Sequence, residues 1–247
     1  MGNVNDTFFD GSYKDVWRSM IPDELTTKET AYIISRFSLL SGSLVLDLMC
    51  GYGRHTLALS RQGIQVTAVD NLSAYTNEIA GIVKQENLPV EVHCVSVLDF
   101  KPAHSFDVAI CMGNNLNFFD RADNIRILSS VARSLKPGGF VFINTWSLAE
   151  IVWKNHREKS WSQEGDYKYI ADSRVLFNPT RIESETTLIA PDGNQEHKSA
   201  VDYIFSLNEM EDILRESGLI MEEVYSVPGR KKFTIGDPRA YIIAVKA

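Results

Sequence analysis

Short apolar runs alternate with amphipathic or turn-rich stretches between residues 44 and 146. Each run is rich in Val, Ile, Leu or Phe and ends near a glycine or a polar residue, a pattern typical of strands buried in a parallel sheet. The intervening stretches have helical spacing or carry turn residues. Together these alternations predict an α/β fold with a doubly wound, mostly parallel sheet. The expected strands are 44–48, 65–70, 90–96, 106–112 and 140–146.

The pattern changes after residue 146, where a stretch of about 60 residues is longer than one crossover helix requires. Polar and apolar positions alternate there as in strands with one solvated face. Asn178-Pro179 and Pro191-Asp192-Gly193 lie between the extended runs and carry turn chemistry. We therefore expect an inserted antiparallel β-meander. Its strands are expected at 168–177, 181–189 and 197–205, and a helix at 207–216 and strands at 220–227 and 241–245 follow.

These changes of pattern divide the chain into successive regions. We expect a helical cap or lid first, then a cofactor-binding α/β core, then the inserted β region, and last a helix with a strand pair that completes the core sheet. The inserted region would shape a substrate pocket or form a dimer contact. The corresponding boundaries are 1–42, 43–146, 147–206 and 207–247.

Composition narrows the class of protein. The 247 residues are 44% hydrophobic and 23% charged, as in an ordinary globular protein. The net charge of −7 argues against a nucleic-acid partner, which usually requires a basic face. Cys50, Cys94 and Cys111 lack C-x-x-C spacing, and no apolar run reaches the length of about 18 residues that spans a membrane. We therefore expect a cytoplasmic protein, monomer or homodimer, without metal or membrane partner.

A glycine turn follows the first expected strand. Gly51 and Gly53 lie between the apolar run around Asp47 and a helical stretch that begins near Arg54. Glycine allows the main chain to approach a ligand closely, and a helix start offers free N–H groups to polar ligand atoms. A dinucleotide fingerprint would need glycine where Thr56 stands, and no Gly-Lys-Ser/Thr ending of a P-loop is present. The turn therefore predicts a nucleotide-like ligand of another kind.

The same turn resembles the first motif of class I S-adenosylmethionine-dependent methyltransferases, an acidic residue followed by x-Gly-x-Gly-x-Gly. Asp47, Gly51 and Gly53 match this motif, and Met49 stands where its first glycine usually lies. The resemblance covers nearly the whole chain and is strongest over 44–146. It implies S-adenosylmethionine as cofactor and a Rossmann-like, seven-stranded sheet that ends in an antiparallel pair.

The resemblance also implies a set of cofactor-binding residues. Asp70 ends the second strand, where in the family a carboxylate accepts hydrogen bonds from both ribose hydroxyls, and a solvated surface acid is the alternative. Asp99 follows the third strand, where the family binds the adenine amino group, and a loop aspartate that caps a turn is the alternative. The complete expected set is Asp47, Gly51, Tyr52, Gly53, Asp70, Asn71, Leu98, Asp99 and Met112.

The acceptor site is expected after the fourth strand, in the segment 113–119, which resembles the family's stretch beside the reactive methyl group. Its asparagines offer neutral donors and acceptors to a substrate, but asparagine also favours turns. An N-terminal aromatic residue often covers the cofactor in resembling enzymes, and simple packing is the alternative. The expected catalytic residues are Tyr13, Asn115 and Asn117, and the expected substrate-binding residues are Trp17, Asn114 and Trp146.

These features predict methyl transfer to an amine or hydroxyl of a small molecule by in-line displacement. Such a reaction needs alignment and exclusion of water, and an amine that arrives deprotonated needs no base. Nucleic-acid amino-methyltransferases that resemble this fold usually carry an Asp/Asn-Pro-Pro-aromatic sequence, whereas this chain has Gly113-Asn114-Asn115-Leu116. The alternatives are a cofactor-binding protein without catalysis, because of Met49, an RNA or protein methyltransferase, and a nucleotide-dependent oxidoreductase.

Overall fold

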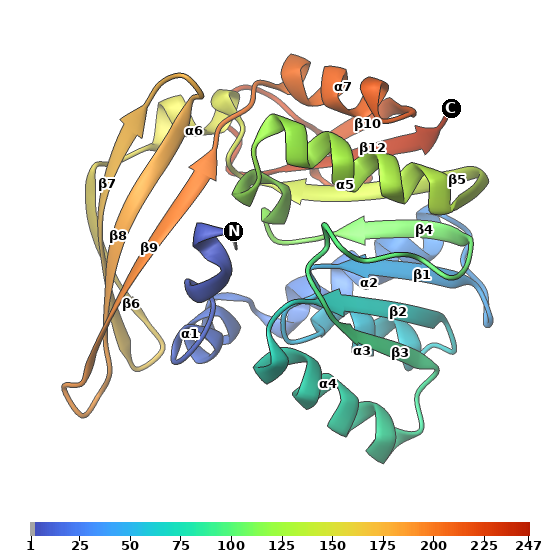
Figure 1. Cartoon of the computed structure of the whole chain (residues 1–247), viewed down its shortest axis with the longest axis horizontal. Helices are drawn as coiled ribbons and strands as arrows, with labels where there is room; N and C mark the ends of the chain where they lie inside the picture. Colours follow the sequence, from blue (N-terminus) through green and yellow to red (C-terminus); the bar gives the residue numbers. More distant parts are fainter. Residues whose placement is uncertain (1–2) are drawn as a thin grey trace.

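Two sheets organise the computed structural model, which describes residues 3–247 (Figure 1). The larger sheet has eight strands in the order β11-β10-β12-β5-β4-β1-β2-β3, and the smaller has four in the order β6-β7-β8-β9. The strands of the larger sheet are β1 (Leu44–Leu48), β2 (Gln65–Asp70), β3 (Val90–Cys94), β4 (Phe106–Cys111), β5 (Leu135–Thr145), β10 (Leu219–Val227), β11 (Lys231–Lys232) and β12 (Ala240–Lys246).

Strands β1 to β5 form the parallel part of the larger sheet. β1 lies between β2 and β4, β3 pairs with β2, and β5 pairs with β4, all in parallel. β12 then pairs antiparallel with β5 and β10. The order of the strands reverses between β1 and β4, so their carboxyl ends leave a crevice in which such sheets bind ligands.

Helices cover both faces of this sheet because both faces of its strands are apolar. Ile127 and Leu128 of α5 pack with Ile213 of α7 on one face, and Ile33 of α2 packs with Leu59 of α3 on the other. This is the doubly wound arrangement that the sequence predicts. The helices are α1 (Tyr13–Met20), α2 (Asp23–Arg36), α3 (Arg54–Ser60), α4 (Ser73–Glu86), α5 (Arg121–Ser134), α6 (Ala149–Asn155) and α7 (Leu207–Glu216), with short 3-10 helices η1 (Val4–Thr7) and η2 (Asn115–Phe118).

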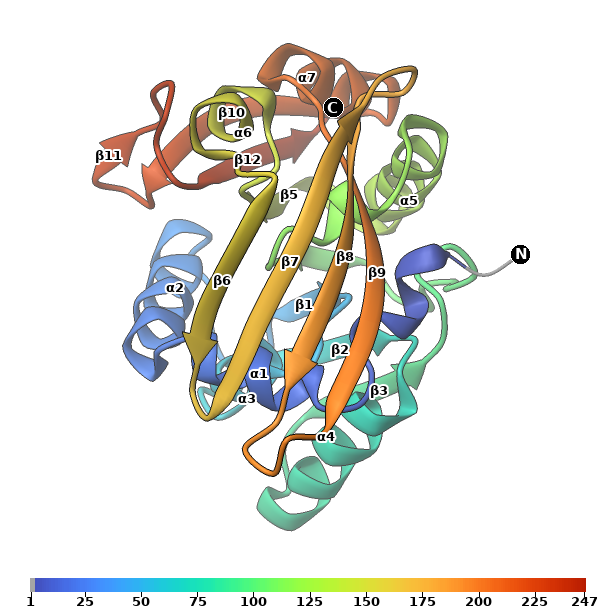
Figure 2. The same ribbon diagram turned by 90° about the vertical axis from the view of Figure 1, so that its left-hand side faces the viewer.

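The N-terminal segment lies between the two sheets (Figures 1 and 2). Phe8, Tyr13 and Val16 form a small apolar core with Leu188 and Ala200 of the second sheet. The second sheet therefore packs against the N-terminal segment, which in turn faces the crevice of the larger sheet. The strands of the second sheet are β6 (Lys159–Glu164), β7 (Tyr167–Leu176), β8 (Arg181–Ile189) and β9 (Gln195–Tyr203).

Several details differ from the sequence expectation. The larger sheet has eight strands instead of seven, because residues 231–232 pair with β10. The inserted region begins with α6 and has four strands instead of three, because the mostly exposed residues 159–164 pair with β7 along their length. The expected cap over 1–42 begins with Met1 and Gly2, which lie outside the described residues.

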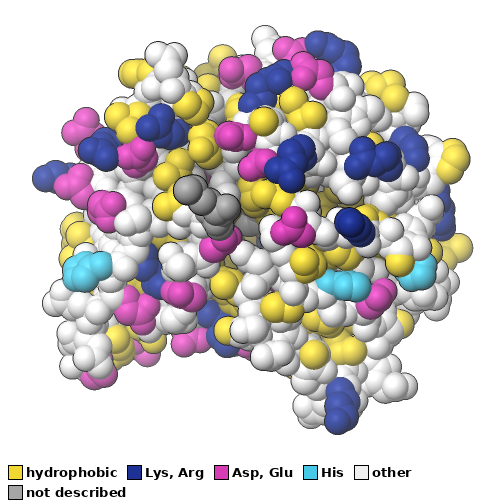
Figure 3. Space-filling model, viewed as in Figure 1, with side chains coloured by type: hydrophobic (Ala, Val, Ile, Leu, Met, Phe, Trp, Pro, Cys, Tyr) yellow, Lys and Arg dark blue, Asp and Glu magenta, His cyan; other side chains and the backbone are white. Residues whose placement is uncertain are grey.

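Charged side chains of both signs are interspersed over the face shown in Figure 3. None of the helices within residues 3–247 is long and apolar enough to cross a membrane.

Candidate active site

A cavity lies at the carboxyl ends of β1, β2 and β4, beneath the N-terminal segment. One part of its wall comes from the glycine turn and the end of β2, with Asp47, Gly51 and Asp70. Another part comes from Trp17 of α1 and from the segments that follow β4 and β5. Further lining residues that the sequence expectation includes are Tyr13, Tyr52, Asn71, Met112, Asn115 and Trp146.

The glycine turn has a backbone that most side chains do not favour. Gly51 has φ +55° and Gly53 has φ +78°, both in the left-handed region. A Cβ on Gly53 would lie 2.7 Å from Cγ1 of Ile79, whereas a Cβ on Gly51 would meet nothing within 4 Å. Gly53 therefore allows α4 to pack closely against the turn, and Gly51 leaves open space on the cavity side.

Met49 adopts the left-handed conformation without being glycine, with φ +53°. Its carbonyl oxygen accepts a hydrogen bond of 2.8 Å from Nδ2 of Asn115, and its side chain lines the cavity and packs on the core. The turn therefore forms with methionine at the position that is usually glycine in the resembling family.

Two carboxylates lie in this part of the cavity. Asp70 is 7% exposed; its Oδ2 accepts from the backbone N–H of Gly51 at 2.8 Å and its Oδ1 from Leu72 at 3.0 Å. Burial raises the pKa of Asp70, although these backbone bonds oppose it. Asp47 is 2% exposed and accepts a 2.6 Å bond from Thr56, and burial raises the pKa of Asp47 to about 7 against the effect of that bond.

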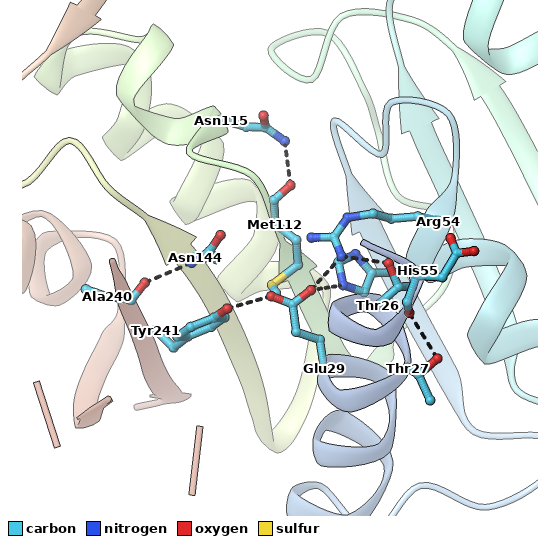
Figure 4. Close-up of polar contacts among 11 residues, drawn as sticks. Thr26, Thr27, Glu29, Arg54, His55, Met112, Asn115, Asn144, Ala240 and Tyr241 are labelled. Atoms are coloured by element: carbon cyan, nitrogen blue, oxygen red, sulfur yellow. Dashed lines mark hydrogen bonds and ion pairs between the residues drawn. The ribbon is translucent and has the colours of Figure 1, made fainter. Parts of the chain in front are cut away.

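A buried ionic cluster supports the first turn of α3 (Figure 4). Glu29 of α2 accepts hydrogen bonds from Nη1 of Arg54 at 2.5 Å and from the hydroxyl of Tyr241 at 2.6 Å, and its Oε2 lies 3.0 Å from Nε2 of His55. Arg54 and His55 also line the cavity. The cluster therefore joins α2, α3 and β12 directly behind the glycine turn.

Burial, hydrogen bonds and charges within this cluster shift the pKa values of Glu29 and His55. Burial alone would raise the pKa of Glu29, but the hydrogen bond to His55 and the charge of Arg54 outweigh it and lower the pKa to about 2. Burial and the charge of Arg54 lower the pKa of His55 to about 4. Glu29 is therefore ionised and His55 neutral at physiological pH. The sequence pattern did not indicate Glu29, whose partners lie far away in the chain.

The opposite part of the cavity is aromatic. Trp17 and Trp146 approach to 5.8 Å between ring centroids, and a Cβ on Gly113 would lie 3.5 Å from Cζ2 of Trp17. Tyr13 is 7% exposed and packs on Phe8, with 4.7 Å between the two ring centroids. Burial raises the pKa of Tyr13 well above its usual value, so its hydroxyl stays protonated.

The sequence predicts that Asn114, Asn115 and Asn117 all lie at the acceptor site, but the structure does not bring all three to the cavity. Among them, Asn115 lines the cavity. Asn114 and Asn117 are buried beside it, where both accept from the hydroxyl of Thr145, at 2.9 and 2.7 Å. Nδ2 of Asn117 donates to the carbonyls of Ser147 and Tyr203. The side chains of Asn114 and Asn117 are therefore bonded to neighbouring chain segments and do not line the cavity.

Leu98 and Asp99 also lie elsewhere. They face a separate groove beside α5, and Ser96 and Val97 line the cavity in their place. The residues that line the cavity lie one to three positions earlier in the loop after β3 than the sequence predicts, because no local pattern specifies the path of this loop. Gly53 is likewise a packing residue and not a lining residue.

Polar contacts hold the N-terminal segment over the cavity from two sides. Toward α4, Lys14 and Arg18 both pair with Glu78, and Nδ2 of Asn71 donates to Asp6 at 2.7 Å. On the side of the second sheet, Lys198 donates to Asp10 at 2.5 Å. Asp6 and Arg54 are cavity residues that sequence reasoning did not select, because nothing in the local pattern distinguishes them from surface charges.

Comparisons with known proteins agree with this geometry. Residues 45–139 match the family described as a methyltransferase domain. A carboxy-S-adenosyl-L-methionine synthase of Alteromonas mediterranea is 27% identical over 76% of this chain and 85% of its own length. A ubiquinone biosynthesis O-methyltransferase of Chromobacterium violaceum is 31% identical over 45% of this chain, and the match spans about half, 48%, of that relative.

Solved structures share the fold over nearly the whole chain. An S-adenosylmethionine-dependent methyltransferase of Clostridium acetobutylicum has a TM-score of 0.82 at 17% identity, with 95% of this chain and 96% of the other covered. CalS10, an amino pentose methyltransferase of Micromonospora echinaspora, has a TM-score of 0.71 at 16% identity, with 96% and 98% covered. At these identities the likeness concerns the fold.

The crevice, the glycine turn and the acid that ends β2 define a nucleotide-binding α/β protein. More particularly, the protein is an S-adenosylmethionine-dependent methyltransferase that is similar over residues 45–139 to the methyltransferase-domain family, and its methyl donor is S-adenosylmethionine. The cavity fits that donor, because a Cβ on Gly51 would point into open space and the buried Asp70 faces the cavity beside it. Within residues 3–247, no group of three or more His, Cys, Asp or Glu is arranged to hold a metal ion.

Proposed function

We propose that this methyltransferase acts on an amine or hydroxyl of a small molecule by in-line displacement. The observation that carries the proposal is a single cavity that joins the carboxylates of the glycine turn to the aromatic pair Trp17 and Trp146, with the N-terminal segment across it. A covered cavity of this kind suits a small acceptor better than an RNA or a protein chain. The structural likeness to an amino pentose methyltransferase is consistent with it.

We assign donor binding to the residues of the turn and of β2. Asp70 keeps unused lone pairs after its two backbone bonds, so its carboxylate would accept from the ribose hydroxyls. Asp47 lies deeper, where its charge would pair with the amino group of the donor. Tyr52, Asn71 and Met112 line the same part of the cavity and would pack around the donor. The donor supplies an activated methyl group on a sulfonium.

We assign acceptor binding to the aromatic part. Tyr13 and Trp17 come from the N-terminal segment and Trp146 from the end of β5, so the acceptor would be held between separate elements of the chain. Their rings exclude water from the reacting atoms. The inserted region would contribute indirectly, since its Lys198 and Leu188 hold the N-terminal segment in place.

Calorimetric titration with S-adenosylhomocysteine, with NAD as the control, tests the donor site. Micromolar binding of the first and none of the second is expected. Formation of S-adenosylhomocysteine from S-adenosylmethionine in the presence of small amines and alcohols then tests the acceptor class. Methylation of a peptide or RNA preparation, with no turnover of any small acceptor, would contradict the proposal.

A further inference from the structure

The amide of Asn115 is held in one orientation. Its Nδ2 donates to the carbonyl of Met49 at 2.8 Å and to the carbonyl of Met112 at 3.2 Å; Figure 4 shows the second of these bonds. An asparagine amide has two N–H groups, and both are used here. Rotation of the amide would place its oxygen against two carbonyl oxygens, so only Oδ1 is available to a ligand.

Oδ1 of Asn115 lies in the aromatic part of the cavity. It is 3.7 Å from the position of a Cβ on Gly113, and Cζ2 of Trp17 is 3.5 Å from the same position. Asn115, Gly113 and Trp17 all line the cavity. Throughout residues 3–247, no side chain or backbone N–H donates to this oxygen. The cavity therefore presents a fixed hydrogen-bond acceptor beside the aromatic pair.

No base accompanies this acceptor in the aromatic part of the cavity as the described residues form it. Asp47 and Asp70 lie at the glycine turn, where they accept bonds from Thr56, Gly51 and Leu72. Asp6 of η1 also lines the cavity, but its two oxygens accept from Nδ2 of Asn71 and from the backbone N–H of Asn3. His55 is bound to Glu29. Tyr13 is buried with its proton retained.

Another carboxylate lies nearby but outside the cavity. Asp202 of β9 accepts from Nδ2 of Asn114 at 3.0 Å and from the hydroxyl of Ser147 at 3.3 Å. Its bonds tie β9 to the segments after β4 and β5 and leave it behind the cavity wall. It therefore does not supply the missing base to the acceptor.

We propose that the acceptor is a primary or secondary amine whose N–H group donates to Oδ1 of Asn115. The inference deepens the proposed function and rests on it. A hydroxyl can donate to the same oxygen, but it must lose its proton to become a good nucleophile, and an amide oxygen is not a base. A neutral amine carries both the N–H and a free lone pair, so it needs only to be oriented.

The step balances without a further reactant. The lone pair of the amine nitrogen forms the new N–C bond, the C–S bond breaks, and its electron pair remains on sulfur. The positive charge passes from sulfur to nitrogen, and the N–H that faces Asn115 becomes more acidic and a stronger donor. The ammonium product loses a proton to solvent after it leaves the cavity.

A matched set of small probes tests the inference on the unaltered protein. Benzylamine, N-methylbenzylamine, N,N-dimethylbenzylamine and benzyl alcohol share one aromatic group and differ in the nucleophile. With S-adenosylmethionine at a pH near the pKa of benzylamine, the first two are expected to yield S-adenosylhomocysteine. The tertiary amine lacks an N–H and the alcohol lacks a base, so neither should react. Methylation of benzyl alcohol at a rate equal to that of benzylamine overturns the inference and leaves the proposed function standing.

Turnover of none of the four probes, in protein that binds S-adenosylhomocysteine, would contradict the proposed function, and the inference with it. The variant Asn115→Ala tests the residue itself. We expect its kcat/KM for benzylamine to fall by about tenfold or more, the value of one lost hydrogen bond near a forming charge. Binding of benzylamine to protein saturated with S-adenosylhomocysteine should weaken in parallel, while the affinity for S-adenosylhomocysteine changes by less than about threefold.

Asn155→Ala is the matched control, because Asn155 also donates from Nδ2 to a backbone carbonyl, that of Ile151, but lies in α6 away from the cavity. It should leave the amine kinetics unchanged. An Asn115→Ala variant that keeps the kcat/KM of the unaltered protein for benzylamine would remove Asn115 from the acceptor site.

Discussion

The backbone N–H of Gly51 donates to Oδ2 of Asp70 across 2.8 Å. This bond ties the glycine turn after β1 to the end of β2, so the residues that would face the base and ribose of a nucleoside share one rigid unit. The carboxylate that is proposed to bind the donor is therefore also the residue that holds the turn in position.

Replacement of Asp70 should weaken binding of the methyl donor. We expect Asp70→Ala to raise the Kd for S-adenosylhomocysteine by at least about tenfold, because charge-assisted bonds contribute about 1.5 to 3 kcal/mol each. Calorimetric titration measures this. Asp99→Ala serves as the comparison and should leave the Kd unchanged, since Asp99 faces a different groove. The reverse result would restore Asp99 to the donor site.

The left-handed backbone at Met49 predicts an unusual order of stabilities. At φ +53° alanine is strained and glycine is not. The free energy of unfolding of Met49→Gly should therefore exceed that of Met49→Ala by about 1 kcal/mol. Guanidinium unfolding followed by circular dichroism measures the difference. The same pair of substitutions at Met112, which is not among the described positive-φ residues, should show the opposite order. A more stable Met49→Ala variant would contradict the strained turn.

Titration of His55 should make the fold sensitive to mild acid. The pKa of His55 is lowered by burial and by Arg54 to about 4, whereas the unfolded chain takes up the proton near 6.5. The unfolded state therefore binds more protons between these values, and stability is lost as the pH falls through this window. By about pH 5 the loss relative to neutral pH is roughly 2 kcal/mol.

The variant His55→Gln isolates this effect, because it cannot titrate. Asp47 works in the opposite direction, since its pKa is raised by burial to about 7, but it is present in both proteins and cancels in their difference. We expect the unaltered protein to lose about 2 kcal/mol more than His55→Gln between about pH 7 and pH 5 in urea unfolding. Parallel pH profiles would show that His55 titrates normally.

Titration of Asp47 should appear in donor binding. Burial raises the pKa of Asp47 to about 7, against the hydrogen bond from Thr56, so the carboxyl is largely neutral below that pH. If the ionised form pairs with the donor's amino group, the affinity for S-adenosylhomocysteine rises by about tenfold from about pH 6 to about pH 8. Calorimetry across this range measures the change. Asp47→Asn should bind more weakly at the higher pH and lose the dependence; a dependence that persists belongs to another group.

Asn117 should behave as a structural residue. Asn117→Ala removes one acceptor of the Thr145 hydroxyl and the amide donor to the carbonyls of Ser147 and Tyr203, which should cost at least about 2 kcal/mol in thermal or chemical unfolding. The KM for an amine acceptor should stay unchanged at temperatures where the variant is folded. A raised KM with unchanged stability would instead support the catalytic role expected from the sequence.

The strand pattern, the glycine turn and Asp70 could be predicted from the sequence because each depends on neighbours in the chain. The apolar runs indicate buried parallel strands, and Gly51 and Gly53 occur where the backbone turns left-handed. The N-cap of α5 is also as expected, since Asp120 accepts from the N–H of Asp123. The second sheet was foreseen less completely, because β6 is exposed and lacks an apolar pattern of its own.

The sequence by itself thus determined the doubly wound core and the glycine turn that lines the cavity together with Asp70. Tertiary structure alone decided which asparagine lines the cavity, because η2 turns Asn115 toward the cavity and Asn117 into the protein. It alone also brought Glu29 to Tyr241, 212 residues away, and Asp6 to Asn71. A local pattern reports what a residue's neighbours favour, whereas these contacts depend on how separate layers pack, and that is set by the whole chain at once.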